Sequence, residues 1–145
     1  MLIAAAGILR ERGETFSITF VGDTASPDTQ EYYVSLQEQI RMLGIADRVW
    51  FVGGVLHEML PRYLAAADIF VNPSETGSLD KAGLEALVCG VPLLTCNEAF
   101  AELFGAYAER LLFPKRDPLA LAEAICAVHR APDRSLEGPR GTQHQ

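Results

Sequence analysis

The sequence predicts an α/β fold of the doubly wound class, with a mostly parallel, Rossmann-like sheet. Short runs rich in β-branched and aromatic residues alternate along the chain with segments whose apolar residues recur at helical spacing. The connections between these segments are short, and strands that alternate with helices in this way form a parallel sheet covered on both faces. The sequence has no internal repeat of fixed period, which excludes a solenoid.

Length and composition favour one soluble-type globular domain. A chain of 145 residues buries about 70% of its unfolded surface, which is enough for a sizeable core. A content of 49% hydrophobic and 21% charged residues argues against wholesale disorder and against a fibrous class. The net charge of -7 argues against a general nucleic-acid binder, because that affinity needs clustered Lys and Arg. We expect an ordered lobe over residues 1–131 and a disordered polar tail over residues 132–145.

The expected elements follow from these patterns. The predicted strands are Phe16–Val21, Val49–Val52, Ile69–Val71, Val91–Thr95 and Arg110–Phe113. The predicted helices are Leu2–Leu9, Tyr33–Leu43, Leu60–Ala67, Lys81–Cys89, Glu98–Phe104 and Leu119–His129. Gly13 and Gly44 follow the first two helices and are expected to end them. We expect Ala67 and Leu119 to face the core.

The order of the elements at the start of the chain is unusual for this class. Doubly wound sheets begin with a strand that lies in the middle of the sheet, whereas this sequence begins with a helix. We therefore expect the first central strand to be missing from the given chain. The strands Phe16–Val21 and Ile69–Val71 would then each present an unpaired edge.

Candidate binding residues follow the predicted strands, because ligands of open α/β sheets lie outside the carboxyl ends of the strands. Four such places stand out: Gly22 with Asp23; Gly53, Gly54 and Val55; Pro73 to Lys81; and Asn97 with Glu98.

The loop before the helix Lys81–Cys89 suits an anion such as a diphosphate. A helix start presents free N–H groups and a partial positive charge. Gly77 would let a ligand approach the backbone, Ser78 adds a hydroxyl donor, and Lys81 adds a positive charge. An ordinary helix start capped by Ser78 or Asp80 is the alternative, and taken alone the loop favours it.

Glu85 is the candidate acidic residue of this helix. Its carboxylate lies one turn after the helix start and could accept two hydrogen bonds from a ribose diol. Taken alone, the position is more typical of an exposed surface glutamate.

Several longer motifs point to one known family. They are Phe51–Val55, Leu60–Ser74 and Leu84–Thr95. Together they resemble the C-terminal, donor-binding lobe of the group 1 retaining GT-B glycosyltransferases, and the resemblance runs from about Leu2 to about His129. It implies an enzyme that transfers a sugar from a nucleoside diphosphate sugar to an acceptor hydroxyl with retention of configuration. The chain would be a partial donor-binding lobe of such an enzyme.

The resemblance also implies roles for individual residues. Glu85 matches the second Glu of the family's Glu-x7-Glu motif, which binds the ribose hydroxyls. The backbone of Gly53–Val55 would hold the base, and the helix start at Lys81 and Ala82 would meet the diphosphate, beside Gly77. The donor is then a nucleotide sugar.

The sequence departs from the family pattern at the first Glu of this motif. That Glu should lie eight residues before Glu85, where this chain has Gly77. The string Thr76–Lys81 resembles a variant loop found in some group 1 members. Asp80 and Glu75 are the carboxylates that could take over sugar binding, although neither matches by position.

The remaining expectations concern cofactors, partners and location. No cofactor or metal is expected, since the sequence has no Asp-x-Asp pair. The family's basic phosphate clamp and acceptor lobe would lie upstream, so we expect this chain alone to bind donor weakly and transfer nothing. The acceptor stays open between a glycan, a lipid-linked sugar and a small molecule. Three cysteines without metal-ligand spacing predict a cytoplasmic protein, and peripheral membrane association stays open for the full-length protein.

Two alternative functions stay open on the sequence. The first is a GT-B nucleotide-sugar epimerase, which would need acid and base groups that the sequence does not reveal. The second is a non-catalytic nucleotide-sugar-binding domain or remnant that pairs with a separate acceptor lobe.

Overall fold

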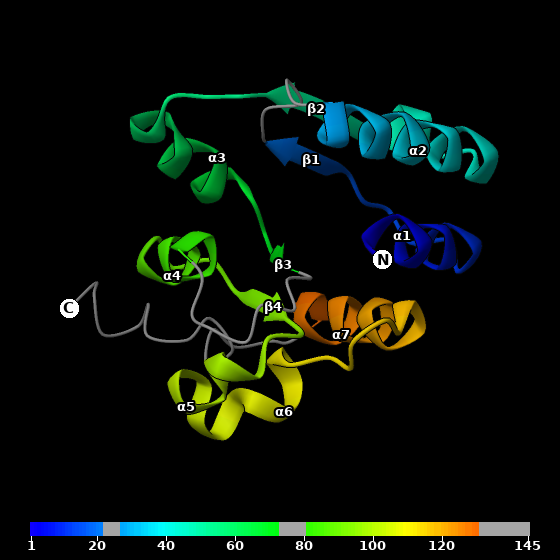
Figure 1. Cartoon of the computed structure of the whole chain (residues 1–145). Helices are drawn as coiled ribbons and strands as arrows, with labels where there is room; N and C mark the ends of the chain where they lie inside the picture. The colour runs from blue at the N-terminus through cyan, green and yellow to red at the C-terminus, as the bar shows by residue number, and fades with distance from the viewer. Residues whose placement is uncertain (22–26, 73–80, 131–145) are drawn as a thin grey trace. The chain divides into compact units, whose positions relative to one another are not determined.

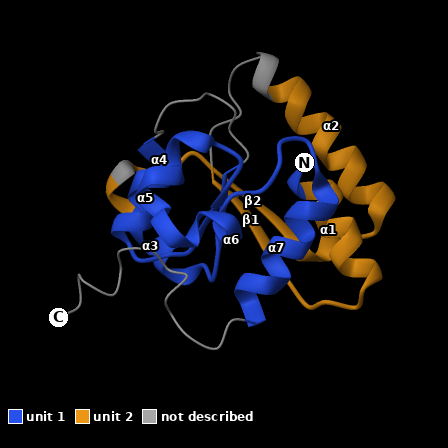
Figure 2. Cartoon of the chain, turned by 90° about the horizontal axis from the view of Figure 1, so that it is seen from below, with its two compact units in different colours: residues 1–2, 60–145 blue, residues 3–59 orange. Residues whose placement is uncertain are grey.

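The structure is a computed structural model, and it describes residues 1–21, 27–72 and 81–130. The chain forms two compact units (Figure 2). One comprises Ile3–Met59, and the other comprises Met1–Leu2 with the chain from Leu60 onward. Both units combine helices with a short parallel sheet, so the predicted α/β class is confirmed. No helix in the described ranges is long and apolar enough to cross a membrane.

The Ile3–Met59 unit is built around two parallel strands (Figure 1). Its elements are α1 (Leu2–Glu11), β1 (Ile18–Val21), α2 (Pro27–Leu43), η1 (Ala46–Arg48), β2 (Val49–Gly53) and η2 (His57–Met59). Phe20 pairs with Phe51, but the next residue of β1, Val21, pairs with Gly53. The register therefore shifts at Val52, which is the extra residue of a β-bulge.

Glycines end both long helices of this unit, as predicted. Gly13 has a φ of 77° and Gly44 a φ of 70°, a conformation that side chains with a Cβ rarely adopt. After α1, the N–H of Glu14 donates to the carbonyl of Leu9 at 3.0 Å, which satisfies one of the last free carbonyls of the helix. The chain is thereby turned sharply from each helix toward the following strand.

The core of this unit joins the two helices to one face of the sheet. Phe20 and Phe51 stack with ring centroids 5.0 Å apart, and the ring of Tyr33 meets Phe51 edge-on at 4.7 Å. The buried members of the cluster are Ile3, Ala6, Leu36, Ile40, Ile45 and Val49. On the opposite face of β2, Trp50 is 53% exposed. Strand residues thus alternate between the core and the surface.

Two arginines of this unit make polar or cation–π contacts. The guanidinium of Arg48 lies 5.0 Å from the ring centre of Phe16 and donates to the carbonyl of Glu14 at 3.0 Å. Arg48 therefore fixes the segment that leads from α1 into β1. On the exposed side of α2, a hydrogen bond to the Glu38 carboxylate raises the pKa of Arg41 above its ordinary value.

The second unit contains the other parallel pair, β3 and β4. Its elements are α3 (Leu60–Ala66), β3 (Phe70–Asn72), α4 (Lys81–Val88), β4 (Leu93–Thr95), η3 (Glu98–Phe100), α5 (Ala101–Phe104), η4 (Gly105–Tyr107), α6 (Ala108–Leu111) and α7 (Pro118–Arg130). The strands pair in simple register from Phe70 with Leu93 to Asn72 with Thr95. The ends of β3 and β4 therefore lie at one edge.

Each sheet has only two strands within residues 1–21, 27–72 and 81–130. In that part of the chain β1 pairs only with β2, and β3 pairs only with β4. The unpaired edges expected on β1 and β3 are therefore present among the described residues.

The predicted strand Arg110–Phe113 is wrong. Arg110 and Leu111 belong to α6, because the N–H of Leu112 donates to the carbonyl of Ala108 and closes a helical turn. Two strand-like contacts to Thr95 remain: an isolated parallel bridge from Leu112 and a hydrogen bond from the N–H of Phe113 at 3.0 Å. A short apolar run fits a buried helix end as well as a strand, so periodicity could not separate the two.

Two predicted core positions are exposed. Ala67 lies just beyond the end of α3, and Leu119 in the first turn of α7 is 48% exposed. The buried face of α7 is instead carried by Leu121, Ala122 and Val128. The helix itself was predicted correctly, but the side of its first turn that faces the core was not, because Leu121 rather than Leu119 is buried there.

Ile40 provides a direct test of the core of the Ile3–Met59 unit. Replacing Ile40 by Ala should lower the free energy of unfolding by about 2–5 kcal/mol, because it removes a buried side chain and leaves a cavity. Met42 in the same helix is 74% exposed, so Met42→Ala is the matched control, with an expected change within about 0.5 kcal/mol. Urea unfolding followed by circular dichroism measures both. Equal effects of the two changes would refute this assignment of the core.

Candidate functional site

The candidate phosphate-facing site begins where β3 ends. Asn72 is the last residue of β3, and the next described residue, Lys81, is the first of α4. Gly77 and Ser78, predicted to meet the diphosphate, lie outside the described residues, as do Glu75 and Asp80. The roles expected for these four residues stay predictions.

Helix α4 has one exposed side and one buried side. Lys81 and Ala82 in its first turn are exposed, whereas Gly83, Ala86 and Leu87 are buried. Glu85, four residues after Lys81, is half-buried. Because residues four apart share a helix face, Lys81 and Glu85 lie one above the other. The structure thus brings a cation and a carboxylate together on the side of α4 that faces away from the core.

The first turn of α4 suits an anion electrostatically. It contains no acidic residue, and Lys81 is its one charged side chain. The free N–H groups of a helix start add a partial positive charge of roughly half an elementary charge. An anionic group placed there would meet the helix dipole and Lys81 together, while Glu85 is one turn further along.

Packing holds α4 in place. Its buried side contacts α3, β3 and β4, and the local core consists of Leu64, Ala86 and Val91 with Leu60, Phe70 and Cys89 packed against it. Gly90 ends the helix with a φ of 79°, and the N–H of Val91 donates to the carbonyl of Ala86 at 3.0 Å. The orientation of the exposed side is therefore fixed by the apolar side.

The residues predicted to hold a base lie at the end of β2, in the Ile3–Met59 unit. Gly53 ends the strand with a φ of 82°, and a Cβ built there would meet nothing within 4 Å. Gly54 is exposed and Val55 is half-buried. Glycine is thus required at position 53 by the positive φ angle and not by steric crowding of a Cβ atom. The space beside Gly53 is open.

The end of β4 contributes Thr95, to which the sequence assigned no role, and Asn97, which was a candidate only because it follows a predicted strand. Thr95 and Asn97 are both fully buried, although polar side chains are mostly exposed in proteins. In the sequence, Asn97 is marked only by its position just after a predicted strand. That position does not predict that its side chain is buried.

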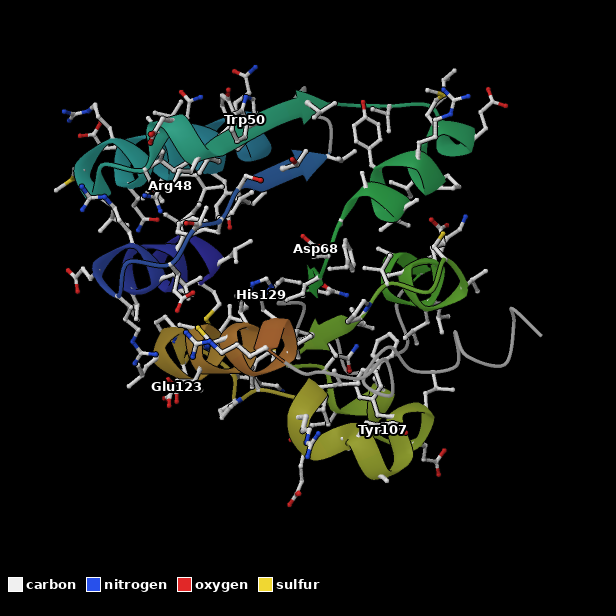
Figure 3. The ribbon with its side chains drawn as sticks, turned by 180° about the vertical axis from the view of Figure 1, so that it is seen from behind. Arg48, Trp50, Asp68, Tyr107, Glu123 and His129 are labelled. Carbon is white, nitrogen blue, oxygen red and sulfur yellow. The ribbon has the colours of Figure 1, made fainter. Side chains whose placement is uncertain are left out.

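The described part of the chain shows no clustered metal-ligating side chains. Within it, no group of three or more His, Cys, Asp or Glu side chains lies close enough to hold a metal ion. His129 lies exposed in the last turn of α7 (Figure 3), as expected for a surface histidine. The cysteines are free thiols, with Cys96 buried and Cys89 and Cys126 half-buried.

Comparison with known proteins identifies the family. A family model described as glycosyl transferases group 1 matches residues 1–130. The chain belongs to the group 1 glycosyl transferases. This match covers both described units and every element from α1 to α7, so the family resemblance of the sequence motifs is confirmed.

Individual group 1 relatives agree with this assignment. A GDP-mannose-dependent alpha-(1-6)-phosphatidylinositol monomannoside mannosyltransferase from Mycolicibacterium smegmatis is 38% identical, over 97% of this chain and 35% of its own length. A sucrose-phosphate synthase structure from Thermosynechococcus elongatus is 25% identical with a TM-score of 0.79, over 98% of this chain and 36% of the other.

A third relative was crystallised with a nucleotide sugar. The structure of HepE from Anabaena in complex with UDP-glucose has a TM-score of 0.78 at 21% identity, over 97% of this chain and 39% of the other. At that identity the likeness shows the fold. The chain thus spans between 35% and 39% of the length of these three proteins.

The left-handed backbone of Gly53 can be tested by substitution. Gly53→Ala should lower the free energy of unfolding by about 1–2 kcal/mol, because a Cβ is disfavoured at a φ of 82°. The neighbouring Gly54 is exposed and lacks a positive φ, so Gly54→Ala should be neutral or slightly stabilising. Denaturant titrations of both variants measure the difference. A neutral Gly53→Ala change would contradict the described turn.

Proposed function

We propose that the protein transfers a glycosyl group from a nucleoside diphosphate sugar to an acceptor hydroxyl with retention of configuration. In this proposal the chain supplies a partial donor-binding lobe, and an acceptor lobe belongs to the rest of the protein or to a partner chain. Membership of the group 1 glycosyl transferases supports transfer over an epimerase or a non-catalytic remnant. The mannosyltransferase and synthase names of the relatives agree with it.

The observation that carries the proposal is the exposed side of α4. Lys81 is the first residue of α4, whose first turn contains no acidic residue, and Glu85 lies one turn further on the same side. We propose that the helix start and Lys81 bind the diphosphate, with Ala82 contributing its backbone N–H, and that Glu85 accepts hydrogen bonds from the ribose diol.

Catalysis in this proposal is mainly electrostatic. Negative charge grows on the diphosphate as the sugar leaves, and N–H groups with a cationic side chain stabilise that charge. Closure of the donor site against water would strengthen the same interactions. No metal or cofactor is part of the proposed arrangement.

The relatives narrow the choice of nucleotide but not the choice of acceptor. The M. smegmatis relative is GDP-mannose-dependent, whereas HepE was crystallised with UDP-glucose. UDP and GDP are therefore the two probes of choice for this protein. The backbone of Gly53–Val55 is proposed to hold the base, and the acceptor stays open between a glycan, a lipid-linked sugar and a small molecule. We also propose that the protein is located in the cytoplasm.

The role of Glu85 can be tested with a thermodynamic cycle that combines one substitution in the protein with removal of the diol from the ligand. Glu85→Ala should weaken binding of UDP or GDP by about 1.5–3 kcal/mol, the usual contribution of hydrogen bonds to a charged group. With a 2′,3′-dideoxy nucleoside diphosphate, which lacks the diol, the same change should cost almost nothing. Isothermal titration calorimetry measures each affinity.

Glu123 is the matched control for this cycle. It is an exposed glutamate on α7 of the same unit (Figure 3), so Glu123→Ala should leave all affinities unchanged. An equal loss for the diol and dideoxy ligands would remove Glu85 from ribose binding.

The role of Lys81 can be tested by salt dependence. Lys81→Ala should weaken UDP or GDP binding several-fold at low ionic strength and leave binding of the uncharged nucleoside unchanged. The gap between variant and wild type should narrow as salt is added, because Lys81 is exposed and its charge is screened. Lys115→Ala, at another exposed lysine, is the control. A loss that is equal for nucleoside and diphosphate would place Lys81 away from the phosphates.

A further inference from the structure

The turn after β4 is held by two buried polar side chains. Thr95 and Asn97 are the fully buried polar residues of the described chain. Burial of a polar group is costly unless it is hydrogen-bonded. The Oγ1 of Thr95 accepts from the N–H of Asn97 at 3.0 Å, and the Oδ1 of Asn97 accepts from the N–H of Ala99 at 3.0 Å. The two side chains therefore fix the backbone from the end of β4 into η3.

The same turn is tied to the segments beside it. The carbonyl of Thr95 accepts from the N–H of Phe113 at 3.0 Å, and Thr95 forms a parallel bridge with Leu112. On its other side Thr95 is the register partner of Asn72, the last residue of β3. The turn is thus anchored on both flanks and has little freedom to move independently.

The position of this turn connects it with the candidate site. Both strands change from apolar to polar at their last residue, Asn72 in β3 and Thr95 in β4. Because the strands are parallel, both ends lie at the edge from which the chain proceeds toward α4. Ligands of open α/β sheets lie outside this edge.

We infer that Thr95 and Asn97 are positioning residues of the nucleoside diphosphate site. They act through the backbone of residues 95–99, which they hold in register with the end of β3, rather than by touching the donor. Small displacements of site-forming groups lower affinity and rate strongly. The inference rests on the proposed function, since it assigns these residues to that same site.

The test compares variants that lose a side-chain acceptor with variants that keep one. Thr95→Val keeps the shape but loses Oγ1, and Asn97→Ala loses Oδ1; each should weaken UDP or GDP binding about five- to tenfold under conditions where the variant is folded. Thr95→Ser and Asn97→Ser retain a hydroxyl acceptor and should restore affinity to within about twofold of wild type. Calorimetry gives the affinities, and circular dichroism confirms folding.

Asp117→Ala is the matched control. Its Oδ1 accepts from the N–H of Ala120 at 3.0 Å at the start of α7, a bond of the same kind and length. This change should lower stability to a similar extent and leave donor affinity unchanged. If Asn97→Ala fails to fold, the shape-preserving Thr95→Val carries the test.

The outcomes separate this inference from the proposed function. If wild type binds and the folded Thr95→Val and Asn97→Ala variants keep its affinity, the positioning role is overturned. The same holds if Asp117→Ala weakens binding equally. If wild type binds neither UDP nor GDP, the proposed function itself fails, and the positioning role fails with it.

Discussion

The packing of α4 is the constraint on which the candidate site depends. Ala86 and Leu87 are almost completely inaccessible to solvent, and they hold the helix against α3 and the β3–β4 pair. That contact leaves only one side of α4 available to a ligand. That side or its first turn carries Lys81, Glu85 and the free N–H groups of the helix start. Their geometry is therefore set by the apolar contacts on the opposite, buried side of the helix.

Backbone conformation supports the same arrangement at several turns. Positive φ angles at Gly13, Gly44 and Gly90 end three helices, and each allows the chain to turn back toward a strand. At the end of β4 the chain uses side-chain hydrogen bonds from Thr95 and Asn97 instead of a glycine. The glycine turns depend on the absence of a Cβ atom. The turn after β4 depends instead on buried side-chain oxygens that accept backbone hydrogen bonds.

Much of the fold could be predicted because its signals are local. The glycine helix ends follow from the conformational freedom of one residue, and the buried Leu36 and Ile40 of α2 follow from helical spacing. The assignment of Arg110–Phe113 to a strand failed because a short apolar run has no period long enough to decide. The burial of Asn97 could not be predicted either, since it depends on segments brought together only in the folded unit.

For the site, Lys81 and Glu85 share a side of α4 as their spacing implies, whereas their ligand roles depend on a partner molecule.

The most direct test of the central claim is an amide chemical-shift titration with UDP and GDP. We expect one of the two nucleotides to shift the amide resonances of Lys81 to Glu85 most strongly, with little change in the exposed part of α2. Nucleotide binding that leaves the resonances of Lys81 to Glu85 unshifted, or no binding of either nucleotide, would contradict the proposed site.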